Sequence, residues 1–143
     1  MLTATVFAVF AALACLPVAG CDTVAGRMAN AAEAARQGDN FLAKGNRHKA
    51  VEAYTRAIKL KPDLTSAYLS RAVALNELGQ PEEALADFTK AIELDPTNSY
   101  PYEQRSHIYR TALKDSRRAD ADKARAEALR QGRWNNLQKL RKK

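Results

Sequence analysis

Apolar side chains recur three and four positions apart over much of residues 31–131, which is the spacing of one face of an α-helix. No stretch alternates apolar and polar residues in the way that a half-buried β-strand does. The pattern therefore predicts an all-α fold without a sheet. The expected helices lie near residues 26–44, 47–60, 65–78, 81–94, 99–112 and 116–131.

Part of this pattern is repeated at an offset of 34 residues. The segment GNRHKAVEAYTRAIKLKPD begins at Gly45, and GQPEEALADFTKAIELDPT begins at Gly79. Each glycine falls between two expected helices, where a left-handed backbone is often required, and Pro62 and Pro96 fall where the second helix of each unit must stop. Because one helical hairpin cannot bury its apolar face alone, the units are expected to stack on one another.

The recurring residues resemble the signature of the tetratricopeptide repeats, which are 34-residue helical hairpins. The first repeat, about residues 31–64, matches at Gly38, Phe41, Gly45, Ala50, Tyr54, Ala57 and Pro62, and has Ala34 in place of the usual aromatic residue. The second, about residues 65–98, matches at Tyr68, Ala72, Leu75, Gly79, Ala84, Phe88, Ala91 and Pro96. The resemblance implies a short α-solenoid of about three hairpins over residues 31–132.

The third repeat, about residues 99–132, is the degenerate one. Tyr102, Ser106 and Tyr109 fit its first helix, but the turn glycine and the closing proline are missing. Its second helix fits only if one residue is inserted in the turn. Ala119, Asp122 and Ala126 then correspond to Ala84, Asp87 and Ala91.

The excess positive charge lies at the C-terminal end. Residues 114–143 hold eleven Lys or Arg and four acids, a net charge of +7, whereas residues 1–113 hold twelve of each sign. A polar helix at 116–131 would shield the last apolar face of the array, as a capping helix does. Gly132 is expected to break or kink this helix. In the basic tail, residues 133–143, the spacing of Trp134, Leu137 and Leu140 predicts a last short helix that lies back on the array.

The first twenty residues carry no charged side chain and are interpreted as a targeting signal outside the fold. Residues 18–21, Val-Ala-Gly-Cys, resemble a bacterial lipobox. This resemblance implies a lipidated Cys21, a short tether over residues 21–30, and a location in the cell envelope facing the periplasm. Asp22 favours the inner membrane. An uncleaved membrane anchor and ordinary signal cleavage remain the alternatives.

In the tetratricopeptide repeat family, which this sequence resembles, a groove is lined by the first helix of each hairpin. Carried over position by position, this predicts a peptide-binding groove whose residues are Asp39, Leu42, Leu69, Val73, Asn76, Glu77, Tyr100, Glu103, His107 and Arg110. The alternative is that these are solvated positions without a ligand. The clamp that some members use for acidic carboxylate tails is absent, since Ala35, Asp39, Ser70, Tyr100 and Gln104 stand at its five positions.

No catalytic, phosphate-binding or metal-binding spacing is found in the sequence, and neither His48 nor His107 has neighbours that suggest a metal site. We therefore expect no enzyme activity, no cofactor and no metal. The expected function is that of an adaptor or assembly factor that docks a peptide segment of another envelope protein. One alternative is binding to anionic lipid or polymer through Arg130, Arg133, Lys139, Arg141, Lys142 and Lys143, with nucleic acid not expected; another is a self-associating scaffold.

Overall fold

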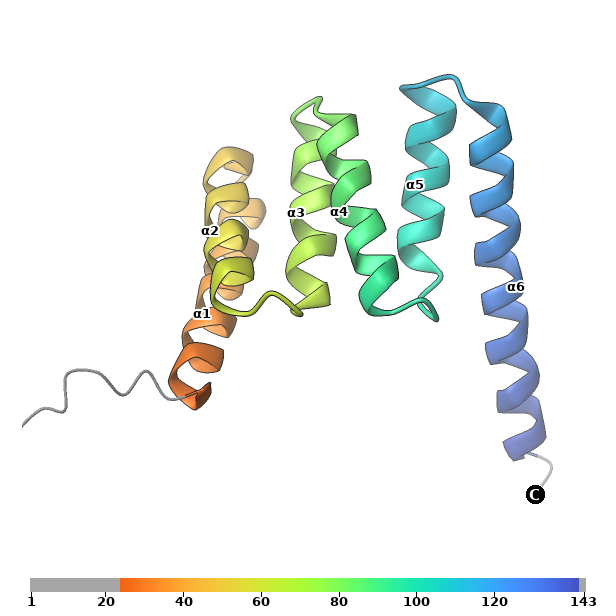
Figure 1. Cartoon of the computed structure of the whole chain (residues 1–143), viewed down its shortest axis with the longest axis horizontal. Helices are drawn as coiled ribbons and strands as arrows, with labels where there is room; N and C mark the ends of the chain where they lie inside the picture. The colour runs from red at the N-terminus through yellow and green to blue at the C-terminus, as the bar shows by residue number, and fades with distance from the viewer. Residues whose placement is uncertain (1–23, 142–143) are drawn as a thin grey trace, which may run out of the picture.

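The computed structural model describes the backbone of residues 24–141 and the side chains of residues 24–133. These residues form six helices and no strand, so the predicted all-α fold is confirmed (Figure 1). The helices are α1 (Val24–Ala43), α2 (Arg47–Leu60), α3 (Thr65–Glu77), α4 (Pro81–Leu94), α5 (Tyr100–Thr111) and α6 (Ser116–Arg141). The bounds of the first five lie within two residues of those expected from the sequence.

The helices pair as three hairpins, α1 with α2, α3 with α4 and α5 with α6. Successive hairpins are joined by packing of α2 against α3 and of α4 against α5. The array therefore extends in one direction, with α1 and α6 at its two ends (Figure 1). Fully buried alanines at the helix contacts, Ala50, Ala57, Ala84 and Ala91, allow the backbones to approach closely.

The turns inside the hairpins follow the predicted glycine rule. Gly45 and Gly79 have φ values of 73° and 76°, in the left-handed region that a side chain disfavours. In the third hairpin, which lacks the glycine, Lys114 takes this role with φ 55°. The third turn therefore carries a conformational cost that the first two avoid.

The core between the second and third hairpins is built around one aromatic ring. Phe88 of α4 is buried in a cluster with Ala72, Leu75, Ala84 and, from α5, Ile108. Full burial of a side chain of this size stabilises a fold by about 1.5–3 kcal/mol. Phe88 therefore helps to join the two hairpins as well as filling its own.

The one-residue insertion proposed for the third repeat is also seen. Ala119 and Ala126 are fully buried, as Ala84 and Ala91 are, and Asp122 is buried like Asp87. The second helix of the degenerate repeat therefore packs in the register inferred from the sequence.

Helix α1 begins at Val24, two residues before the expected start at residue 26, so its first residues lie within the expected tether over residues 21–30. One expectation is wrong at the C-terminal end of the array. Helix α6 passes through Gly132 and reaches Arg141, so no separate last helix folds back on the array. A glycine inside a helix costs only about 1 kcal/mol relative to alanine, and one such residue among good helix formers does not end it.

The targeting signal and Cys21 lie outside the described residues. Within residues 24–141, none of the helices combines the length and apolar character needed to cross a bilayer.

Candidate functional site

The ten predicted groove residues lie on the first helix of each hairpin. Helix α1 carries two of them, α3 carries four and α5 carries four. On α3, Leu69, Val73 and Asn76 are spaced four and three residues apart and so share one face. Glu103, His107 and Arg110 repeat this spacing on α5. The structure thus brings the predicted residues onto matching faces of three helices, and their role in binding stays a prediction.

Four of these residues have charges that already interact within the chain. The contacts are Asp39 Oδ1 with the Tyr54 hydroxyl at 2.7 Å, Glu77 with Arg47, Glu103 with Arg130 at 3.4 Å, and Arg110 with Asp120. The ion pairs are substantially solvent-exposed, and such pairs contribute only about 0–1 kcal/mol. They orient the side chains at the groove and can be exchanged for contacts with a ligand at small cost.

The centre of the predicted groove is apolar. Leu69 and Val73 are half-buried and pack against the cluster around Phe88, with the half-buried Asn76 one turn beyond Val73. On α5, Tyr100 keeps 41% of its surface exposed. Partial burial raises the pKa of its hydroxyl, and the nearby Glu103 raises it further, so the phenol stays protonated as a hydrogen-bond donor at neutral pH. An apolar strip with an amide and a phenol beside it can hold an extended or helical chain.

A polar contact that the sequence analysis did not predict fixes the spacing of α3 and α4. Arg71 on α3 donates two hydrogen bonds to the buried carboxylate of Asp87 on α4, both at 2.7 Å, and a third to the Thr55 hydroxyl at 3.0 Å. The paired carboxylate raises the pKa of the guanidinium above its usual value. Because Thr55 belongs to α2, the arginine links two hairpins.

The same contact recurs in the third hairpin. Arg105 on α5 donates to both oxygens of Asp122 at 2.7 and 2.8 Å, and to the Thr89 hydroxyl of α4 at 2.9 Å. The recurrence of arginine and threonine at the 34-residue offset, with Asp122 displaced by one residue, is the sequence signal that could have revealed both pairs.

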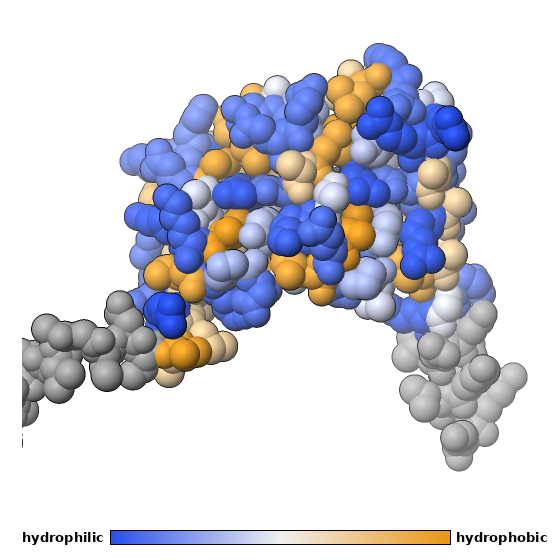
Figure 2. Space-filling view, viewed as in Figure 1, coloured by the Kyte–Doolittle hydropathy of each residue, from blue (hydrophilic) through white to orange (hydrophobic). Residues whose placement is uncertain are grey.

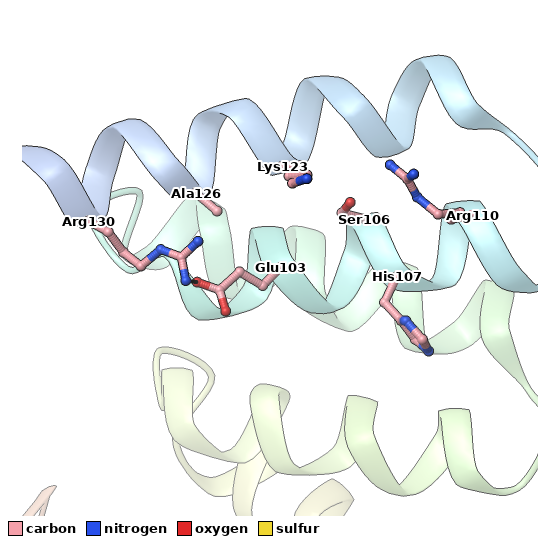
Figure 3. A pocket seen from close by; sticks show the side chains of 7 residues that line it. All are labelled: Glu103, Ser106, His107, Arg110, Lys123, Ala126 and Arg130. Carbon is pink, nitrogen blue, oxygen red and sulfur yellow. Dashed lines mark ion pairs between the residues drawn. The ribbon is translucent and has the colours of Figure 1, made fainter.

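An open cavity of about 320 Å³ lies between α5 and α6 and was not foreseen from the sequence. It is lined by Glu103, Ser106, His107, Arg110, Lys123, Ala126 and Arg130. Figure 3 shows the Glu103 and Arg130 side chains reaching toward each other across it, while His107 points away from α6. The cavity has small residues, Ser106 and Ala126, at its buried floor and charged residues at its rim.

The surface around these features is largely hydrophilic, with apolar side chains showing between the polar ones (Figure 2). Among the described residues, no three His, Cys, Asp or Glu side chains are grouped so that they could hold a metal ion. What the site offers is hydrogen-bonding groups, charges and apolar strips on a scaffold of packed helices.

Comparison with known proteins bears on the fold and the family. A family model described as tetratricopeptide repeat matches residues 35–99. Hsp70-Hsp90 organizing protein 3 of Arabidopsis thaliana is 36% identical over 78 residues, a match that covers 54% of this chain. The chain spans only 14% of the length of that relative.

Two solved structures resemble the array as a whole. The second tetratricopeptide domain of Spaghetti (RPAP3), bound to an HSP90 peptide, is 28% identical with a TM-score of 0.69, and the match covers 74% of this chain and 96% of that one. The Arabidopsis OM64 tetratricopeptide domain is 31% identical, also with a TM-score of 0.69, over 73% of this chain and 85% of that one. Since the helix phase, the turn glycines and these matches agree, the chain belongs to the tetratricopeptide repeat family.

Proposed function

We propose that this protein is a non-catalytic adaptor that binds a peptide segment of a partner protein along α1, α3 and α5. The observation that carries the proposal is the half-buried apolar strip of Leu69 and Val73, flanked by Asn76 on α3 and by Tyr100 and His107 on α5. Further support comes from the Spaghetti domain, which has a similar fold and binds a peptide.

The ligand we infer differs from the HSP90 peptide of that neighbour. The SRMEEVD peptide ends in acidic and carboxylate groups, and this chain has none of the Lys, Asn and Arg residues expected at the five clamp positions. A peptide that presents apolar side chains to Leu69 and Val73, and backbone groups to Asn76, fits the surface better. The charged groups at the two ends of the strip already have partners within the chain, the Tyr54 hydroxyl for Asp39 and Asp120 for Arg110, so the middle of the strip is the main source of affinity.

The proposal can be tested with a displayed library of random 12-residue peptides. Peptides retained by the wild type are synthesised and their affinities measured by fluorescence anisotropy. We expect Asn76→Ala and Val73→Ser each to weaken binding at least fivefold, while Lys59→Ala on the exposed surface of α2 leaves it within twofold. Circular dichroism checks that each variant is folded. Equal affinities for all three variants would refute binding in the groove.

We further propose that the adaptor works in the bacterial cell envelope, anchored by a lipid on Cys21. The support is the sequence of residues 18–21, which follows an uncharged apolar segment. The mature protein is then expected to have the mass of residues 21–143 plus acyl groups, and this mass is expected to be lost in Cys21→Ala. An unmodified full-length mass in both proteins would contradict the lipid anchor.

A second candidate function is binding to anionic membrane surfaces through the C-terminal end. The support is the concentration of the excess charge in residues 114–143, most of which lie on the continuous helix α6. We expect deletion of residues 133–143 to abolish co-sedimentation with anionic vesicles and to leave peptide affinity unchanged. Co-sedimentation that is insensitive to salt or to lipid charge would exclude the electrostatic mechanism.

A further inference from the structure

The cavity between α5 and α6 lies where a following hairpin would place its first helix. Glu103, Ser106 and His107 of α5 correspond, at the 34-residue offset, to Leu69, Ala72 and Val73 of α3. On α6, Lys123 and Ala126 correspond to Phe88 and Ala91 with the one-residue insertion. The cavity is therefore lined by the counterparts of a known helix-packing surface.

In the second hairpin this surface is occupied by α5. Ala72 and Phe88 belong to the buried cluster that includes Ile108 of α5, and Leu69 and Val73 pack against that cluster. We call the corresponding surface of the third hairpin, formed by the seven residues that line the cavity, the terminal seat. Within the described residues, no helix packs on it, because α6 continues to Arg141 instead of turning back.

The terminal seat resembles the corresponding surface of the second hairpin in its small buried residues and differs from it in the charged residues at its edge. Ser106 and Ala126 are buried, and the Ser106 hydroxyl donates to the Ala119 carbonyl at 2.7 Å, so the floor is pre-formed. Replacement of the ring by the exposed Lys123 leaves the space open. An apolar side chain entering between Ser106 and Ala126 would take a position like that of Phe88 in the second hairpin.

The rim of the seat favours an acidic ligand. Three cations, on Arg110, Lys123 and Arg130, and one carboxylate, on Glu103, line the cavity. Asp120 and Glu127, which lie outside the lining, pair with Arg110 and Lys123, and all three pairs are exposed to solvent. The local partners of two of them are weak and exposed, since Lys123 lies 3.9 Å from Glu127 and Arg130 lies 3.4 Å from Glu103. Incoming carboxylates can therefore replace these exposed pairs at small cost.

We propose that the terminal seat docks an acidic helix of another protein, with one apolar side chain inserted between Ser106 and Ala126 and carboxylates on Lys123 and Arg130. A helix is specified because the equivalent surface holds α5. A second copy of this chain is the poorer occupant, because the net charge of +7 makes two copies repel. This surface is distinct from the proposed groove, although Glu103, His107 and Arg110 border both.

The test uses a displayed library of 16-residue helical peptides, randomised on one face, against the wild type and three variants. Lys123→Glu reverses a rim charge, and Arg125→Glu makes the same charge change on α6 outside the seat. Lys123→Phe fills the cavity with a ring. We expect the wild type to retain helices with an acidic face and one large apolar residue. Their affinity should fall at least tenfold in Lys123→Glu and Lys123→Phe, and less than twofold in Arg125→Glu.

Three outcomes would overturn the proposal. If no acidic helix is retained, or if Arg125→Glu weakens binding as much as Lys123→Glu, the rim only keeps the end of the array soluble. If the retained peptides respond to Asn76→Ala and not to Lys123→Glu, the groove proposal stands and this one fails. If light scattering shows dimers that Lys123→Glu disrupts, the seat belongs to a second copy. Acidic helices that respond to Lys123→Glu, with no ligand for the groove, would leave this proposal standing alone.

Discussion

In the second repeat the ring of Phe88 fills the space between α3, α4 and α5, whereas in the third repeat Lys123 stands at the matching position and a cavity remains beside α5 and α6. The polar framework is nevertheless the same in both. Arg71 with Asp87, and Arg105 with Asp122, form the same two-pronged pair with similar distances and similar burial. Side-chain packing and ion pairing are thus separate contributions to the hairpin.

Different parts of the repeat hold one hairpin together and join it to the next. The Arg–Asp pair connects the two helices of one hairpin and reaches back to a threonine of the previous one. The aromatic ring faces forward to the next hairpin, where Ile108 meets it. In the third hairpin the first contact is present, but no described helix packs against the forward surface, which carries polar residues.

The largest expected effect on stability comes from removing the Phe88 ring, which joins the second hairpin to the third. Phe88→Ala should lower the free energy of unfolding by about 3–4 kcal/mol, because a buried ring at the junction of two hairpins is lost. The matched change Lys123→Ala should cost less than about 0.5 kcal/mol, because that side chain is exposed. Urea unfolding followed by circular dichroism measures both. Similar losses would show that Lys123 has a structural role that its exposure does not reveal.

The next largest effect concerns the Arg–Asp pair that the second and third hairpins share. Asp87→Ala should cost about 2–3 kcal/mol, because it leaves Arg71 half-buried without its carboxylate. Asp122→Ala should cost a similar amount locally, but it should release mainly α6, which packs chiefly against α5. Hydrogen exchange separates the two cases. Loss of protection across the whole array in Asp122→Ala would contradict a local role.

The repeated residues explain why the fold was predictable. Gly45, Gly79, Pro62 and Pro96 mark the turns and helix ends, and the alanines mark the close contacts, so each structural boundary has a local signal. Gly132 resembles those turn glycines in sequence, but helix α6 continues through it. It has no following proline to stop the chain, and its place inside a helix of good helix formers costs too little to end it.

The candidate sites were less predictable because they depend on pairs of residues far apart in the sequence. The groove positions could be named from the repeat phase, but the contacts of Asp39 with Tyr54 and of Arg110 with Asp120 could not. The cavity is present because Lys123 stands where the second repeat has the ring of Phe88. The effect of that replacement can be seen only once the positions of α5 and α6 are known. Sequence periodicity therefore identified the scaffold and left the detailed surface chemistry to the structure.

A smaller effect tests the turn that differs between the two repeats. Gly79→Ala should cost about 1 kcal/mol, because φ at this position is 76° and the space around it is open, so that only backbone strain is added. Lys114→Gly should instead stabilise the protein by about 0.5–1 kcal/mol, because it relieves the same strain in the third turn. Thermal unfolding measures both shifts. Destabilisation by Lys114→Gly would mean that the lysine side chain makes a contact worth more than the strain.

The smallest effect extends the comparison to the first repeat, where Tyr54 stands in place of Phe88 and its hydroxyl donates to Asp39. Burial raises the pKa of this hydroxyl, and the contact with Asp39 raises it further. Above the ordinary pKa of about 10, the unfolded chain releases a proton that the folded protein keeps, so this contribution to stability is complete below pH 10 and is lost progressively above it.

Tyr54→Phe should therefore cost about 0.5–1 kcal/mol at pH 8, through the lost hydrogen bond, and this difference from the wild type should shrink as the pH rises toward 11. Other tyrosines and lysines titrate equally in both proteins, so the difference between the two urea unfolding curves isolates Tyr54. A constant difference from pH 8 to 11 would mean that the hydroxyl ionises as easily in the folded protein as in the unfolded chain. The contribution of Tyr54 to stability would then not depend on the protonation of its hydroxyl.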